Sequence, residues 1–169
     1  MSEEFIYFAG RDLRHDIGGI MQNQVKPFFS EGLWSMHDLL LYLLEITGPA
    51  KVWLSTFSLS EAAIRAIHLA IDKGYITEIH CLFDHTIRKH KLGLLFFASN
   101  TVSNIAITAN HSKLILIEND HWKISVVGSA NMTPNPRKEA GVILTTPSVF
   151  DHFKFHLVKS ISHGIPVKY

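Results

Sequence analysis

The stretch of sequence that decides the fold is residues 110–139, NHSKLILIENDHWKISVVGSANMTPNPRKE. Residues 114–117 are apolar at every position, a pattern typical of a strand that is covered on both faces of a sheet. A second apolar run, residues 124–127, follows after a polar segment, and the two runs together predict a hairpin of antiparallel strands. His111 and Lys113 stand two apart at the start of the first strand, so we expect their side chains to share a face.

The length of the hairpin loop sets which residues meet across the two strands. A five-residue loop, residues 119–123, would place Ser129 opposite Lys113 and Asn131 opposite His111. We therefore expect one end of the hairpin to gather a histidine, a lysine, a serine and an asparagine on one face. A four-residue loop would shift the register by one residue and disperse this group.

These side chains suit the chemistry of a phosphodiester, which carries a full negative charge that spreads over its oxygens when phosphorus is attacked. Lys113 supplies a counter-charge, and Asn131 and Ser129 can donate hydrogen bonds to the phosphate oxygens. An imidazole nitrogen of His111 can attack phosphorus and form a covalent intermediate without a metal ion. Glu139 could accept the other imidazole N–H and so fix the tautomer of the ring.

At these residues the sequence resembles the phospholipase D superfamily, whose motif is HxK with an Asp after four further residues, followed by GSxN. Here the motif reads His111-Ser112-Lys113 and then Gly128-Ser129-Ala130-Asn131, with Glu139 at the place of the acidic residue that usually follows. The resemblance implies a histidine nucleophile, a phosphohistidine intermediate, and no metal or other cofactor. We therefore expect the site to consist of His111, Lys113, Asn131, Ser129 and Glu139 for catalysis, and of Gly128, Thr133 and Arg137, in or next to the motif, for substrate binding.

Two features depart from the family motif. Glu118 stands where the family has Asp, and the spacer from Glu118 to Gly128 is a few residues longer than usual. On a straight strand the seven steps from His111 to Glu118 span about 23 Å. We therefore expect Glu118 to be structural, and the longer spacer to lie at the end of the hairpin far from the site.

The chain holds one such motif, whereas the family's reaction uses two histidines, one that attacks and one that protonates the leaving oxygen. The simplest source of the second is a homodimer in which a two-fold axis brings two copies of His111 to one phosphate. Short single-motif members of the superfamily are similar and are typically nucleases, so we expect an endonuclease that acts on nucleic acid. Two alternatives remain open: a non-catalytic dimer that binds nucleic acid or another phosphate ligand, and a lipid phosphodiesterase.

The rest of the chain alternates predicted helices and strands, which indicates an α/β domain. We expect a phospholipase D-like single repeat with a mixed, mostly parallel sheet and helices on both faces, spanning residues 33–169. Residues 1–32 show no clear period and are assigned to a strand or an N-terminal arm. The predicted helices are residues 36–46, a helix opened by a capping box of Ser58 and Glu61 and ending at Gly74, residues 92–98, and a last helix from Pro147 with Phe150, Phe153, Leu157 and Ile161 on one stripe. The predicted strands are residues 51–58, 76–83, 105–108, 113–117, 124–127 and 141–145.

Composition narrows the class of protein. The 169 residues are 47% hydrophobic and 18% charged, which excludes a disordered or fibrous chain. A formal net charge of +1 means that any polyanion must be held by local charge. The single cysteine excludes a disulfide within the chain, and the acidic start without a long apolar run predicts a cytoplasmic protein with no secretory signal and no membrane segment.

Two other clusters stand outside the motif. His80, Cys81, Asp84, His85 and His90 are zinc-competent residue types, but their spacing sends the side chains in different directions, so we expect no metal site. The most basic segment, Arg88, Lys89 and Lys91, is interpreted either as a solvated helix face or as a contact to the phosphate backbone of a nucleic acid.

Overall fold

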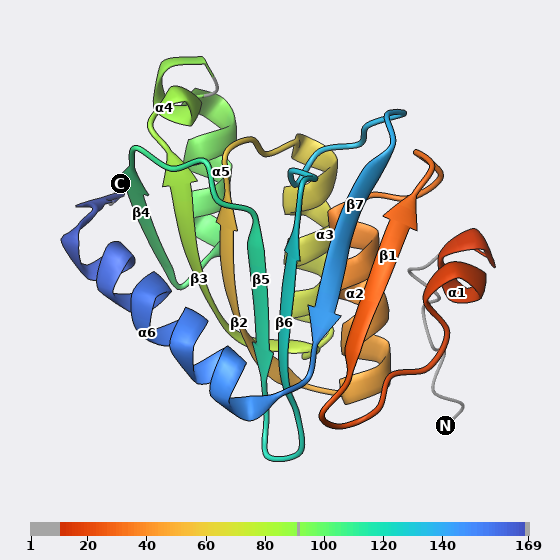
Figure 1. Cartoon of the computed structure of the whole chain (residues 1–169). Coiled ribbons are helices and arrows are strands. Elements are labelled where there is room, and N and C mark those ends of the chain that lie inside the picture. Colours follow the sequence, from red (N-terminus) through yellow and green to blue (C-terminus); the bar gives the residue numbers. More distant parts are fainter. Residues whose placement is uncertain (1–10, 91, 168–169) are drawn as a thin grey trace.

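An eight-stranded sheet with helices on both faces forms the centre of the computed structural model, which describes residues 11–90 and 92–167 (Figure 1). The elements in chain order are α1 (Arg11–Ile17), β1 (Val25–Ser30), α2 (Met36–Thr47), β2 (Ala50–Thr56), α3 (Glu61–Asp72), β3 (Ile76–Asp84), α4 (Thr86–His90), α5 (Leu92–Thr101), β4 (Asn104–Thr108), β5 (Leu114–Glu118), β6 (Lys123–Gly128), β7 (Glu139–Leu144), α6 (Pro147–His163) and β8 (Ile165–Pro166). The predicted α/β class and the flanking of the sheet on both faces are confirmed.

The strands lie in the order β1-β7-β6-β5-β2-β3-β4-β8. Parallel pairing joins β2 to β3 and β3 to β4, whereas every other neighbouring pair is antiparallel. The sheet is therefore mixed, as expected, but the expected parallel majority is wrong. One reason is that the connections from β5 to β6 and from β6 to β7 have only four and ten residues, too few for a parallel crossover. The other is that β1, β5 and β8 pair in antiparallel register with β7, β2 and β4, which lie far from them along the chain.

Two hydrophobic layers cover the sheet. The larger one packs α2, α3 and α5 against one face and includes alternate residues of the central strands, such as Val52, Leu54, Ile115 and Ile117. The intervening residues, such as Trp53 and Leu116, face α6 on the other side. Because β5 is buried on both faces, its four apolar residues are central in the sheet, as their pattern predicted.

α6 crosses its face of the sheet diagonally, from the β6 side toward β4 (Figure 1). Thr146 is its N-cap and Pro147 occupies the first turn, as predicted. Three of the four residues of the predicted stripe, Phe150, Leu157 and Ile161, are buried, and Phe153 packs against them. One side of α6 is thus buried in the core, and the rest of the helix surface is exposed to solvent.

The helix α3 begins two residues later than its predicted capping box. Its N-cap is Ser60, whose hydroxyl accepts a hydrogen bond from the backbone N–H of Ala63 at 3.1 Å. Ser58 instead belongs to the connection after β2, where its N–H donates to Asn131 at 3.2 Å. The expected capping box of Ser58 and Glu61 is therefore wrong, because Ser58 is used to hold a distant loop.

The region before residue 33 adds an edge strand to the sheet, because β1 pairs with β7 in antiparallel register. Gly32 follows at φ +83°, and a Cβ there would lie 2.4 Å from the carbonyl oxygen of Pro136. The described part of this region is thus packed against the loop that follows the GSAN segment. The division of the chain at residue 33 stays a prediction, and residues 1–10 lie outside the described part.

Candidate active site

A cleft of about 830 Å³ opens between α6 and the ends of β3, β4, β5 and β6. Its walls include His111, Lys113, Gly128, Ser129 and Asn131, the residues that the sequence placed together. They reach the cleft from two connections: the segment between β4 and β5, and the turn that follows β6. The structure therefore gathers the central residues of the predicted site in one cleft.

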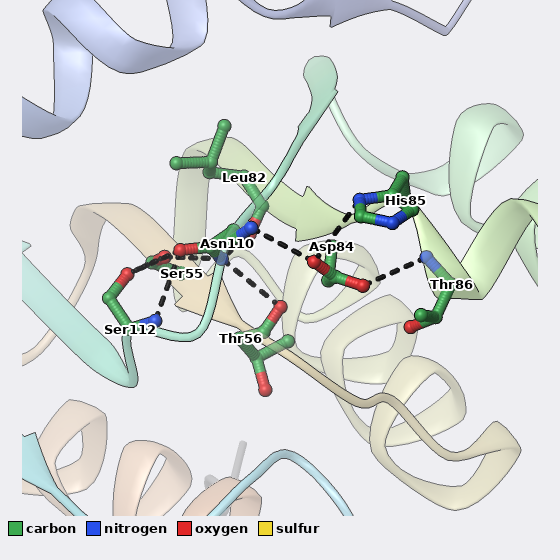
Figure 2. A network of polar contacts seen from close by, with 8 residues as sticks. All are labelled: Ser55, Thr56, Leu82, Asp84, His85, Thr86, Asn110 and Ser112. Carbon is green, nitrogen blue, oxygen red and sulfur yellow. Dashed lines mark hydrogen bonds and ion pairs between the residues drawn. The ribbon is translucent and has the colours of Figure 1, made fainter.

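A buried asparagine fixes the segment that carries His111 and Lys113. Figure 2 shows Asn110 between the ends of β2 and β3, where its Nδ2 donates to Ser55 Oγ at 3.0 Å and to the carbonyls of Thr56 and Leu82, both at 3.3 Å. Its Oδ1 accepts from the backbone N–H of Ser112 at 3.1 Å and from the Ser112 hydroxyl at 2.7 Å. Asn110 thus ties the chain on either side of His111 to two strands of the sheet.

Asp84 holds the same segment from the end of β3. Its side chain is 5% exposed and accepts hydrogen bonds at 2.9 Å from the backbone N–H groups of Thr86 and Asn110 (Figure 2). Burial alone would raise the pKa of Asp84, but these hydrogen bonds and the nearby His85 hold the pKa below its ordinary value. The carboxylate is therefore ionised at neutral pH and serves as a fixed acceptor.

His111 and Lys113 lie side by side just before β5. Lys113 Nζ is 2.9 Å from the carbonyl oxygen of His111 and 3.5 Å from its Nδ1, and the ring of His111 packs at 5.0 Å from the ring of Phe57. The imidazole of His111 is exposed in the cleft. A cation beside an accessible imidazole suits an anionic group that comes within reach of both.

The β5–β6 hairpin differs from its predicted register. Glu118 pairs with Lys123 and Leu114 with Val127, so the loop has four residues, 119–122, instead of five. Asn119 allows this tighter loop, because its Oδ1 accepts from the backbone N–H groups of His121 and Trp122. The expected cross-strand pairs of Ser129 and Asn131 are therefore wrong.

A four-residue loop was expected to move Ser129 and Asn131 away from His111 and Lys113, but it does not do so. β6 ends at Gly128, so Ser129 and Asn131 belong to the turn beyond the strand and are not bound to its alternation. The turn is anchored at Asn131, whose Oδ1 accepts from Ser58 N–H at 3.2 Å and Thr56 Oγ1 at 3.3 Å. These bonds to the end of β2 bring the turn beside the His111 segment.

Glu139 is placed differently from its predicted role. It accepts hydrogen bonds from the hydroxyl of Ser129 and from Asn135 Nδ2, the latter at 2.8 Å. Among the described residues, no hydrogen bond joins Glu139 to His111. The carboxylate of Glu139 therefore orients Ser129 and the following loop within one chain.

Three further predicted residues lie away from the cleft. Thr133 and Arg137 belong to the loop between β6 and β7, and neither is among the described residues that line the cleft. Glu118 lies at the opposite end of β5, where it forms ion pairs with Lys154 at 2.5 Å and with Lys123 at 4.0 Å. This location agrees with the structural role expected for Glu118.

Sequence reasoning missed two groups of residues at the cleft. The first is the buried set around Asn110, which gives no sequence signal beyond polar residues next to strand ends. The second is on α6, where Phe153, His156 and Ser160 line the cleft. The spacing of His156 and Ser160, one helical turn apart beside the apolar stripe, could have placed both on one flank of the helix.

The zinc-competent residues do not converge. Within residues 11–90 and 92–167, no group of three or more His, Cys, Asp and Glu side chains could hold a metal ion. His80 stacks on Trp53 and contacts Glu78, and burial raises the pKa of the Cys81 thiol. The side chain of His90, and Lys91 of the basic segment, lie outside the described residues.

The comparisons with known proteins rest on structure. No protein-family model and no curated protein sequence matches the chain. The fold matches Nuc from Salmonella typhimurium, a phospholipase D family member, with a TM-score of 0.69 and 18% identity over 86% of this chain and 99% of Nuc. It also matches NucT from Helicobacter pylori, with a TM-score of 0.61 and 18% identity over 85% of this chain and 100% of NucT.

A longer protein contains the same unit. Phosphatidylserine synthase from Haemophilus influenzae matches with a TM-score of 0.61 and 12% identity over 86% of this chain but 40% of its own length. The predicted phospholipase D-like fold is thus confirmed, with a chain that spans nearly all of Nuc and NucT. Separately, no helix in the described residues has the length and apolar character needed to cross a membrane.

Proposed function

We propose that this protein is a metal-independent phosphodiesterase, an endonuclease in which His111 attacks the scissile phosphorus. The observation that carries the proposal is the single cleft that holds an exposed imidazole, an ammonium group and a hydrogen-bonding turn within one fold shared with Nuc. Lys113 Nζ lies beside the His111 ring, so an anion that contacts the imidazole also contacts the cation.

Asn131 is suited to bind the phosphate through its amide nitrogen. The bonds from Ser58 and Thr56 occupy its carbonyl oxygen, while no described residue accepts a hydrogen bond from its Nδ2. The two N–H groups therefore remain for phosphate oxygens. Ser129 is held by Glu139 and by the backbone of Ala140, which orients the turn in which Asn131 sits.

The reaction proceeds in two displacements. A ring nitrogen of His111 forms a bond to phosphorus, the bond from phosphorus to the leaving oxygen breaks, and that oxygen keeps the electron pair and takes a proton from a second imidazolium. Water then attacks phosphorus and loses its proton to the same second imidazole, while the phosphorus–nitrogen bond breaks and restores His111. No metal enters either step.

The second imidazole requires a partner chain in this proposal. One motif is present per chain, and a two-fold homodimer supplies a second His111 to the same phosphate. This one-motif chain matches 99% of Nuc and 100% of NucT, so each of those chains is likewise a single unit of this fold. A stable monomer with full activity in sedimentation and turnover experiments would refute the shared site.

The test is cleavage of plasmid and single-stranded DNA in excess EDTA. Wild-type protein should cleave both DNA substrates. His111→Ala should lose activity by at least about 1000-fold, because removal of the covalent nucleophile abolishes both steps. The matched control is His121→Ala, an exposed histidine in the β5–β6 loop. Loss of wild-type cleavage on chelation would refute the metal-free mechanism.

Two other functions are outcomes of the same test. Tight binding of DNA without cleavage would indicate a non-catalytic nucleic-acid-binding dimer that uses the same cleft. Hydrolysis of phospholipid vesicles in preference to DNA would indicate a lipid phosphodiesterase, in line with the fold shared with phosphatidylserine synthase.

A further inference from the structure

The cleft has a second wall that the proposed chemistry does not use. α6 contributes Phe153, His156, Leu157 and Ser160 to the lining, opposite the connections that carry the motif. These four residues lie on adjoining rows of one helix at spacings of three and four, so they form one continuous surface. Any group bonded to a phosphate at His111 has this surface within the same cleft.

The cleft is larger than a phosphate group alone would fill. A volume of about 830 Å³ falls within the range of pockets that enclose whole small molecules, roughly 300–1,000 Å³. Apolar side chains, Leu82, Leu114, Val127 and Leu157, line it as well as the polar motif. A bare phosphate gains nothing from apolar neighbours, so the apolar part of the lining fits a group bonded to the phosphate.

His156 gives this wall a polar edge. Its side chain is exposed, and no described residue forms a hydrogen bond or an ion pair with its ring nitrogens. Its ring is packed on the helix between His152, with ring centroids 4.7 Å apart, and Phe155, at 5.3 Å. The ring is thus supported by neighbours while its nitrogens remain available to a ligand.

Ser160 adds a hydrogen-bond acceptor to this wall, and the lining as a whole carries no acidic group among its described residues. The Ser160 hydroxyl donates to the carbonyl of His156 at 2.9 Å, which leaves its oxygen free to accept a hydrogen bond. None of the described residues that line the cleft is acidic, so its ionisable groups are one lysine and two histidines. A negatively charged ligand therefore meets no carboxylate on either wall.

We infer that the α6 wall, defined as Phe153, His156 and Ser160, is a subsite for a nucleoside attached to the scissile phosphate. A nucleobase has an apolar face, which suits Phe153 and the apolar lining, and a polar edge, which suits His156 and Ser160. An acyl chain has no polar edge and would leave those two groups without partners. This inference rests on the proposed function and adds the residues that bind the nucleoside next to the scissile phosphate.

The test compares two phosphodiesters with the same p-nitrophenol leaving group, methyl p-nitrophenyl phosphate and thymidine 5′-p-nitrophenyl phosphate. Thymidine 3′-p-nitrophenyl phosphate covers the opposite polarity. The variants are His156→Ala and Ser160→Ala, alone and combined. His163→Ala is the matched control, because it removes a histidine of the same helix that does not line the cleft.

Wild-type protein should favour a thymidine ester over the methyl ester in kcat/KM. The combined variant should reduce that preference by at least about 10-fold, mainly through KM, and leave the methyl ester and the His163→Ala control within about 2-fold. A preference that survives the combined substitution would overturn the subsite. So would phospholipid hydrolysis that falls in the same variants while the thymidine esters are unaffected.

The two proposals fail in different ways. If wild-type protein cleaves neither DNA nor any of the esters, the proposed function fails, and fluorescence anisotropy with a short labelled oligothymidylate then tests the subsite by itself. Weaker binding in the combined variant than in His163→Ala would support the subsite without catalysis. Equal binding in the two would overturn it.

Discussion

The buried Asn110 offers the sharpest test of how the fold positions the site, through the substitution Asn110→Ala. Asn110 is only 8% exposed, and its side chain makes five hydrogen bonds, three from Nδ2 and two to Oδ1. A net contribution of about 0.5–1.5 kcal/mol applies to each such bond. The two bonds of 3.3 Å stand at the weak end of that range.

With about 0.5 kcal/mol for each of these two bonds and about 1 kcal/mol for each of the other three, the loss in the free energy of unfolding is about 4 kcal/mol. In a protein of this size that loss lowers the melting temperature by about 8–16 °C. Urea unfolding and thermal melts measure both quantities. The matched control is Asn104→Ala, since Asn104 is exposed at the start of β4 and should change stability by no more than about 0.5 kcal/mol.

Activity adds a second readout for Asn110→Ala. At a temperature where the variant is fully folded, kcat should still fall by about 10-fold or more, because the segment that carries His111 and Lys113 loses its ties to β2 and β3. A loss of stability below about 1 kcal/mol, equal to that of the control, would refute the reasoning. Full activity in a destabilised variant would show that the network supports the fold but does not position the site.

Three further predictions concern other parts of the molecule. Asp84→Asn should lower the free energy of unfolding by about 1–3 kcal/mol at pH 7. Because the pKa of Asp84 is depressed in the folded state, its contribution to stability is complete above about pH 4 and is lost below it. Urea titrations should therefore show the difference in stability between wild type and variant shrinking as pH falls, and a constant difference would contradict this. Gly141→Ala should destabilise by about 1–3 kcal/mol in urea unfolding, because a Cβ there lies 2.3 Å from the Phe28 ring; an unchanged midpoint would refute that packing. Glu118→Gln removes the ion pair with Lys154 and should lower the free energy of unfolding by at most about 1 kcal/mol. DNA cleavage should stay within about 2-fold of wild type, and a large loss of activity would contradict a structural role for Glu118.

Local patterns were enough to predict much of the fold. The all-apolar residues of β5 indicated a central strand, and Thr146-Pro147 marked the start of α6, because both signals depend on neighbours in sequence. The parallel majority and the capping box at Ser58 were wrong for the opposite reason. Each depended on partners far along the chain, such as Asn131, which holds Ser58.

The site shows the same division. The types and spacing of His111, Lys113 and Asn131 were sufficient to predict that they meet, even though the hairpin register was wrong by one residue. Tertiary anchors, not the strand alternation, bring the GSAN turn to the cleft. The contribution of α6 depends on how a helix lies across the sheet, which no local pattern contains.

The covalent intermediate is the most direct test of the account. A radiolabelled DNA oligonucleotide, mixed with wild-type protein in EDTA and quenched by denaturation within the first turnover, should leave label on the protein. The bond should survive base and break in acid, as expected for phosphohistidine, and the labelled peptide should contain His111. Label at another residue, or equal labelling of His111→Ala, would contradict the account.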